Sequence, residues 1–220
     1  MENEEETQNL SNLLKNLLQQ FSSVTNPGEK DEHLQECVQN WFSQHERFTE
    51  IQIFEHLKQI ARNDHDYACL LGFFYDKAFG TPSNLDKAFK WYLRAAEHND
   101  AFGQNIVGYF FMHGYGTKLN YEKAFYWYQK SADNGCNQAK CNIGYCYYCG
   151  FHVKRNRRHA LYWYSKSAEM HDGLSKCELA RMFLWGMGTN ADVHRALKLF
   201  LEAKNLAFVQ VDDYICEVFY

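Results

Sequence analysis

The feature that most constrains the fold is a spacing of 36 residues that recurs through most of the chain. The dipeptide Trp-Tyr occurs at 91–92, 127–128 and 163–164, and Leu-Phe at 199–200 continues the series. Four further columns keep the same phase: Gly72, Gly108, Gly144 and Ala180; Ala88, Ala124, Ala160 and Ala196; Gly80, Gly116, His152 and Gly188; and Asn84, Asn120, Asn156 and Asp192. Self-similarity at one fixed period is the signature of a repeat architecture. The repeats are 65–100, 101–136, 137–172 and 173–208.

Each repeat is expected to form two helices. In the second repeat, apolar and small residues recur at helical spacing over 101–113 and again over 121–134. The segment between them holds two glycines, and Asn120 stands where an N-cap residue belongs. Such a pair cannot bury its own apolar face, so the pairs must stack. The sequence therefore predicts an all-α protein, a right-handed α-solenoid of helix-turn-helix repeats with an N-terminal helical cap.

Aromatic residues make up 17% of the chain, and the repeat gives most of them a structural role. Small residues let helices approach closely, and the larger rings fill the space between layers. On this interpretation the tryptophans at 91, 127 and 163 belong to the core of the repeats.

The residues on either side of the array are also amphipathic. Three apolar stripes precede it within 1–64, and the third starts with Thr49 and Gln52, the spacing of a capping box. We expect these helices to cap one end of the array, the alternative being a separate docking or dimerisation helix. After the array, 209–220 continues the phase and predicts the first helix of an incomplete fifth repeat. Its apolar face either terminates the stack or awaits a partner.

The segment "QNIVGYFFMHGYGTKLNYEKAFYWYQKSADNG", residues 104–135, resembles the Sel1-like repeat, a relative of the tetratricopeptide repeat. That pattern has a Leu-Gly pair, a Tyr three residues later, a G-x-G turn, Lys-Ala, Trp-Tyr, and a closing Ala-Ala and Gly. The resemblance covers 65–208, with Ala78 and His152 replacing turn glycines. It implies a non-catalytic scaffold that assembles other proteins, with roles such as signalling.

The resemblance also implies a concave surface, lined by the outward positions of the first helices, that binds extended or helical peptides. These positions are Phe73, Phe102, Asn105, Tyr109, Met112, His113, Tyr145, Tyr148, Arg181, Leu184 and Trp185. Tyr, Trp, Met and Arg are enriched at protein interfaces. The alternative is that neighbouring helices or the N-terminal segment cover much of this surface.

A basic run follows the first helix of the third repeat and consists of Lys154, Arg155, Arg157 and Arg158. The first two repeats carry Asp86 and Glu122 where the third carries Arg158. Cations at a helix start oppose the helix dipole, at about 0.3–1 kcal/mol each. The run is either a tolerated solvated surface or an anion-recognition patch. The anion would be an acidic or phosphorylated segment of a partner, or the acidic start of this chain.

Cysteine and histidine make the same stretch look like a metal motif. Cys146, Cys149 and His152 form a C-x2-C-x2-H run, with Cys141 upstream. A tetrahedral zinc site would need these groups to converge from a helix and its following turn. We expect buried or surface-lining thiols and no metal, a thiol-based metal or redox sensor being one alternative. Another is a β-lactamase-like hydrolase, an activity associated with cysteine-rich members of the family.

Composition and motifs exclude several other classes. The net charge of −4 argues against a general nucleic-acid binder. No apolar run approaches the roughly 18 residues of a membrane span, and the acidic start "MENEEE" is unlike a signal peptide. No nucleophile–base, phosphate-loop or kinase motif is present. We therefore expect a cytoplasmic protein that is not an enzyme, has no cofactor, and binds other proteins or peptides.

Overall fold

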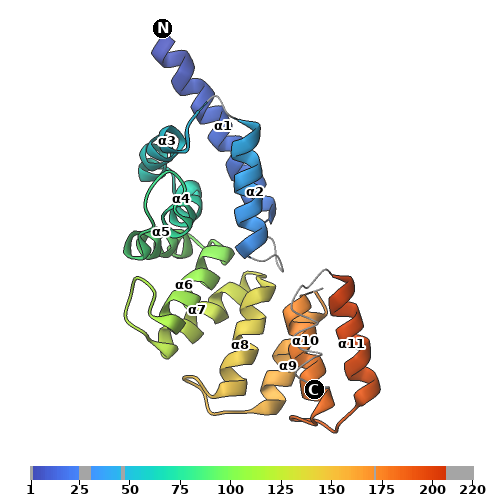
Figure 1. Cartoon of the computed structure of the whole chain (residues 1–220). Helices are drawn as coiled ribbons and strands as arrows, with labels where there is room; N and C mark the ends of the chain where they lie inside the picture. The colour runs from blue at the N-terminus through green and yellow to red at the C-terminus, as the bar shows by residue number, and fades with distance from the viewer. Residues whose placement is uncertain (1, 25–30, 46–47, 171, 207–220) are drawn as a thin grey trace. The chain divides into compact units, whose positions relative to one another are not determined.

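The computed structural model describes the chain except for residues 1, 25–30, 46–47, 171 and 207–220. The described residues form eleven α-helices and one short 3-10 helix, and they contain no strand, so the all-α prediction is confirmed. The helices are α1 (Glu2–Val24), α2 (Asp31–Gln44), α3 (Glu50–Asn63), α4 (Ala68–Lys77), α5 (Leu85–Glu97), α6 (Ala101–His113), α7 (Tyr121–Asp133), α8 (Asn137–Cys149), α9 (Arg157–Ala168), α10 (Gly173–Leu184) and α11 (Val193–Asn205) (Figure 1).

The chain forms two compact units, Met1–Asn120 and Tyr121–Tyr220. In the first unit, α1 packs beside α2 and α3, and α5 packs against both α4 and α6. In the second unit, every helix from α7 to α11 packs against the next one along the chain. Packing between consecutive helices is the arrangement expected of stacked helix pairs.

The tyrosine of each Trp-Tyr dipeptide, and not the tryptophan, is the core residue. Tyr92 and Tyr164 are each 1% exposed, whereas the tryptophans before them are half-buried. A Cβ atom added to Gly72 would lie 2.8 Å from the Tyr92 ring, and one added to Gly144 would lie 2.9 Å from the Tyr164 ring. In the first and third repeats, the recurring glycine of the first helix therefore contacts the tyrosine ring of the second helix.

The prediction that the three repeat tryptophans are core residues is wrong. Adjacent residues on a helix point about 100° apart, so only one of each pair shares a face with the alanines four positions away. Ala88 and Ala96 stand four residues before and after Tyr92, and both are buried. The Trp91 ring instead faces the guanidinium group of Arg94, 5.2 Å from its centroid.

Side chains at the predicted N-cap positions satisfy first-turn amides. Asn84 accepts a hydrogen bond from the Lys87 amide at 2.9 Å, and Asp192 accepts one from the Arg195 amide at 2.9 Å. The capping box is present as well, because Thr49 Oγ1 accepts from the Gln52 amide at 3.3 Å while Gln52 Oε1 accepts from the Thr49 amide at 2.9 Å. These local predictions are confirmed.

At three places a turn glycine lies against the first turn of an earlier helix, whereas His152 takes the place of this glycine in the third repeat. A Cβ added to Gly188 would lie 2.7 Å from the Arg157 carbonyl oxygen, and one added to Gly116 would collide with that of Leu85. Gly80 meets Glu50 of α3 in the same way, and its amide also donates to Glu50 Oε2 at 3.2 Å. Thus α3 contacts the first repeat as α5 contacts the second, while the capping role of 1–64 stays a prediction.

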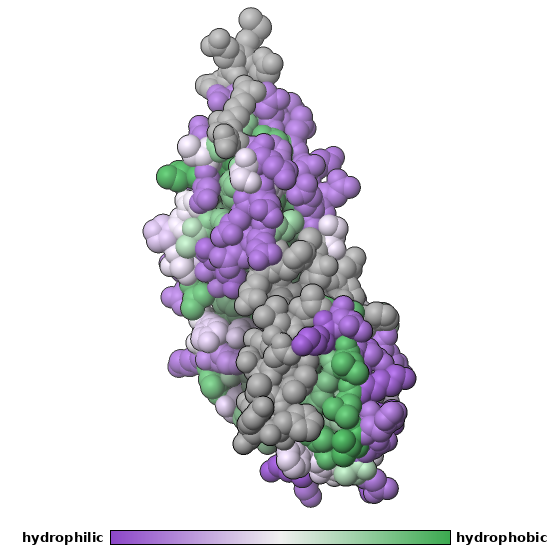
Figure 2. Space-filling view, turned by 45° about the vertical axis from the view of Figure 1, so that its right-hand side comes forward, coloured by the Kyte–Doolittle hydropathy of each residue, from purple (hydrophilic) through white to green (hydrophobic). Residues whose placement is uncertain are grey.

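The last described helix, α11, carries an apolar stripe at its surface. Val193, Leu197 and Leu201, spaced four residues apart, are all exposed and form a hydrophobic band along this helix (Figure 2). The predicted first helix of a fifth repeat, 209–220, lies outside the described residues.

Candidate partner-binding surface

An aromatic pair recurs on the first-helix side of the first three repeats. One ring stands on the first helix and the other six residues later in the turn. The ring centroids are 5.9 Å apart for Phe73 and Phe79, 5.8 Å for Tyr109 and Tyr115, and 5.7 Å for Tyr145 and Phe151. Sequence reasoning missed the three turn residues, although their own spacing of 36 residues could have revealed them.

Helices that precede the array cover the pair of the first repeat. The Phe21 ring from α1 lies edge-on to Phe73 at 5.3 Å, and the Phe42 ring from α2 stacks on Phe79 at 5.8 Å. Phe73 is consequently 0% exposed. The alternative raised from the sequence, coverage by the N-terminal segment, therefore holds at this position.

Three of the predicted surface residues are buried, namely Phe73, Asn105 and Met112. Asn105 and Met112 are seven residues apart on α6. Tyr109, which stands between them in the sequence, and His113 are exposed, with ring centroids 4.1 Å apart. Phe102 is half-buried, and its ring lies 6.0 Å from Phe21.

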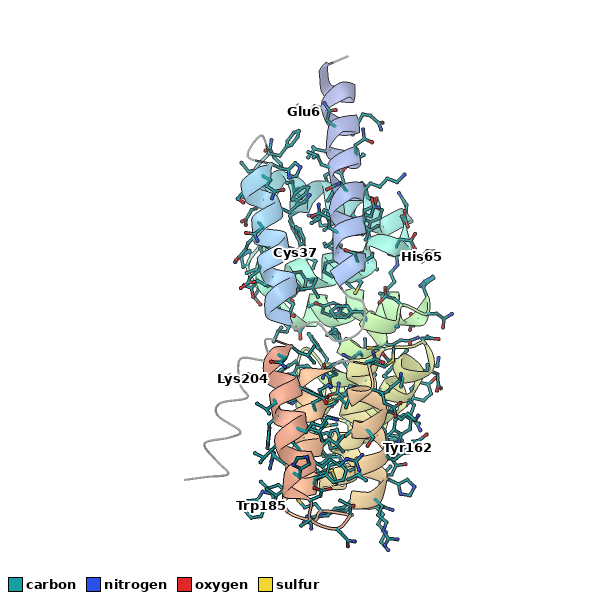
Figure 3. All side chains as sticks on the ribbon, turned by 90° about the vertical axis from the view of Figure 1, so that its right-hand side faces the viewer. Glu6, Cys37, His65, Tyr162, Trp185 and Lys204 are labelled. Carbon is teal, nitrogen blue, oxygen red and sulfur yellow. The ribbon has the colours of Figure 1, made fainter. Side chains whose placement is uncertain are left out.

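The second unit keeps most of its predicted surface residues accessible. Tyr145 on α8 is 45% exposed and Trp185, directly after α10, is 61% exposed (Figure 3). Tyr148, Arg181 and Leu184 are half-buried. The Tyr148 hydroxyl donates to Met187 Sδ at 3.5 Å, which ties α8 to the turn after α10. The Arg181 guanidinium group forms an ion pair with Glu178, in which Nη1 lies 3.3 Å from Oε1.

The four predicted cations of the basic run are all exposed: Lys154, Arg155, Arg157 and Arg158. Three of them, with Asn156 and Gly188, line an open depression of about 520 Å³. Asn156 Oδ1 accepts from the amides of Arg158 and His159 at 3.1 Å each. These two backbone amides therefore already have a hydrogen-bond acceptor within the chain.

The cysteines of the described residues are free thiols, and most of them are buried. Burial raises the pKa of Cys69 and Cys141 well above the ordinary value, and burial followed by the nearby Cys149 raises the pKa of Cys146 to about 12. Protonated thiols are weak nucleophiles and weak metal ligands. These groups therefore do not favour the hydrolase or the thiol-sensor alternative.

The C-x2-C-x2-H run does not gather its ligand atoms in the structure. In the described part of the chain, the group that brings such atoms within 4.8 Å of one another is Asp64, His65 and Asp66, on an exposed segment. His152 instead takes a left-handed turn conformation with φ of 61°, and its ring lies 5.7 Å from Phe125.

A family model of the Sel1 repeat matches residues 65–100, 101–136, 137–172 and 174–208. The chain belongs to the Sel1 repeat family. Sel1 repeats form α-solenoids, act as scaffolds for protein–protein interaction, and are typically non-catalytic. In this Sel1 repeat protein, no helix of the described residues has the length and apolar character needed to cross a membrane.

Solved structures show the same fold. The Sel1 repeat protein from Oxalobacter formigenes matches with a TM-score of 0.72 and 30% identity over 74% of this chain and 65% of its own. The protective antigen c5321 of uropathogenic Escherichia coli, which has an SLR fold, matches with a TM-score of 0.67 and 28% identity over 74% of this chain and 35% of its own. The chain thus spans less than two thirds of either protein. A comparison with curated proteins finds no match.

Proposed function

We propose that this Sel1 repeat protein is a non-catalytic adaptor that holds a partner protein on the first-helix side of its second unit. The observation that carries the proposal is the exposure of Tyr145 and Trp185 there, while the residue equivalent to Tyr145 in the first repeat, Phe73, is covered by α1. Large exposed aromatic side chains are typical anchors of protein interfaces. A signalling assembly is the setting that the family resemblance favours.

Replacement of Tyr145 and Trp185 should greatly reduce the binding of partner proteins. With Tyr145 and Trp185 both replaced by alanine, proteins captured from a cell extract should be depleted by about tenfold or more, because hot-spot aromatics contribute most of the binding energy. Quantitative mass spectrometry of the captured proteins measures this. The control is Tyr162→Ala, an exposed tyrosine elsewhere on the unit, on α9 (Figure 3). An unchanged set of captured proteins from the double variant would contradict the adaptor function.

The basic depression extends the proposal to the charge of the partner. We propose that the guanidinium groups of Arg155, Arg157 and Arg158 bind an acidic or phosphorylated segment. Arginine suits this role because its planar group forms paired hydrogen bonds with carboxylate or phosphate oxygens.

Charge reversal of Arg157 and Arg158 to glutamate should lower the affinity for a captured partner about tenfold at low salt. The affinity of this variant should also depend less on salt concentration. Isothermal titration at two ionic strengths measures both quantities. Lys198→Glu, which reverses an exposed cation on α11, is the matched control. Acidic residues at the start of α9 also favour the helix dipole, so thermal stability should not fall. Unchanged affinity and salt dependence would identify the run as a tolerated solvated surface.

A further inference from the structure

We infer that the aromatic pair Tyr145–Phe151 docks an aromatic side chain presented by an acidic amphipathic helix of a partner protein. The inference rests on the proposed adaptor function and specifies the chemistry of the partner. The same pair in the first repeat, already occupied by helices of this chain, provides the argument.

Helix α1 shows what kind of segment the pair of the first repeat accepts. Leu14, Leu17 and Phe21 form one buried stripe along α1, at the spacing of successive turns. From this stripe the Phe21 ring reaches Phe73 at 5.3 Å and Phe102 at 6.0 Å, edge-on in both cases. An amphipathic helix with a terminal aromatic residue is therefore a ligand that this surface binds within the molecule.

A second helix supplies the other half of the arrangement. Phe42 of α2 stacks on Phe79 at 5.8 Å with an interplanar angle of 24°. Each ring of the first pair thus receives one ring from an N-terminal helix. Edge-to-face and offset-stacked contacts of this kind stabilise aromatic clusters beyond the burial of their area.

In the third repeat the position equivalent to Phe73 is exposed, while the one equivalent to Phe79, Phe151, is half-buried and stacks on Tyr121. Tyr145 and Phe151 stand two repeat periods after Phe73 and Phe79, respectively. The ring centroids are 5.9 Å apart in the first pair and 5.7 Å apart in the third-repeat pair. The same step takes Phe102 to Leu174, which is half-buried. Tyr145 is 45% exposed. An incoming phenyl ring would contact Tyr145 and Leu174 as Phe21 contacts Phe73 and Phe102.

Charge identifies the helix more closely. Lys154 and Arg155 stand three and four residues after Phe151 in the same turn, and both are exposed. Complementary charge speeds and orients docking, so a helix with acidic residues beside its apolar stripe is favoured. The sequence of α1 is acidic overall, because "ENEEET" precedes its stripe of Leu and Phe. These acids stand at least 15 residues before Phe21, so they attract Lys154 and Arg155 at long range, which is effective at low salt. A peptide with the sequence of α1 is therefore a suitable probe.

The test uses a fluorescein-labelled peptide of residues 2–24, titrated into the full-length protein, in which the chain's own α1 covers the first repeat. We expect saturable binding that weakens by about tenfold or more when the peptide carries Phe21→Ala, as expected for loss of an aromatic anchor. Tyr145→Ala combined with Phe151→Ala in the protein should weaken it equally. Lys154→Glu with Arg155→Glu should weaken it most at low salt.

One further variant separates loss of the docking pair from loss of the fold. Phe151 also stacks on Tyr121 at 4.5 Å, so its removal could loosen the turn. Tyr145→Glu leaves Phe151 in place, changes a side chain that is 45% exposed and repels an acidic helix. It should reduce binding while the circular dichroism spectrum stays unchanged.

Three results would overturn the inference. The peptide could fail to bind, bind equally well to all Tyr145 variants, or bind in a manner lost only with Phe73→Ala, which would indicate exchange with the chain's own α1. If one of these occurred while protein capture still depended on Tyr145 and Trp185, the adaptor function would stand and the helical partner would not.

Discussion

Replacement of Tyr164 by alanine is expected to lower the free energy of unfolding by about 3–5 kcal/mol, the range for truncating a buried aromatic residue. The side chain is 1% exposed and belongs to a buried cluster with Ala160, Ala168 and Phe200. Its ring also fills the space that the missing side chain of Gly144 leaves. Alanine would leave a cavity at this contact between α8 and α9. Urea denaturation followed by circular dichroism measures the loss.

The control for this prediction is the adjacent residue. Trp163→Ala removes a larger side chain, yet we expect a loss of about 1 kcal/mol, the centre of the distribution for single substitutions, because Trp163 is only half-buried. Trp163 is half-buried, and it lines a depression together with Tyr126 and Lys130 of α7. A greater loss for Trp163 than for Tyr164 would contradict the assignment of the tyrosine column to the core.

Gly116→Ala is expected to destabilise the protein by about 2–5 kcal/mol, from two causes that add. The backbone of Gly116 is left-handed, with φ of 56°. A residue that has a Cβ is destabilised by about 1–2 kcal/mol in this conformation. The added methyl group would also collide with the Leu85 carbonyl, and forced repacking costs about 1–3 kcal/mol. Urea denaturation gives the total. Hydrogen exchange along α5 and α6 tests whether the loss is centred on this joint.

A second glycine separates the two causes. Gly135 has a φ of 93°, and a Cβ added there would meet nothing within 4 Å. Gly135→Ala should therefore cost only the conformational part, about 1–2 kcal/mol. Equal losses at the two glycines would show that the contact with Leu85 relaxes without cost, and the joint would then be softer than its geometry indicates.

Local chemistry explains which parts of the fold could be predicted from the sequence. The N-caps Asn84, Asn156 and Asp192 and the capping box at Thr49 depend on residues within one turn, and the structure confirms each of them. The helix pairs could also be predicted, because the helical spacing of apolar residues within each repeat is a local signal. The period does not show which of two adjacent residues faces inward, and the tryptophans were misassigned there. The alanines four residues from Tyr92 carried the missing signal.

The candidate surface was harder to predict because its accessibility depends on tertiary contacts. Phe73 occupies the column of Tyr109 and Tyr145, but helices outside the repeats cover it. Nothing in the spacing of the repeats shows where α1 and α2 pack. Tyr115 and Phe151 were missed because they stand in turns, where helical periodicity gives no signal, although they complete the aromatic pairs.

The joints between repeats also bear on how such a chain can change over evolution. Gly80, Gly116 and Gly188 each meet the backbone of an earlier helix, at Glu50, Leu85 and Arg157 respectively. Because the contact is made by backbone atoms, the side chain at the helix start can be acidic, apolar or basic without altering the joint. Duplication or loss of a 36-residue segment would recreate the same joint, so the array can lengthen or shorten by recombination while the helix starts diversify independently.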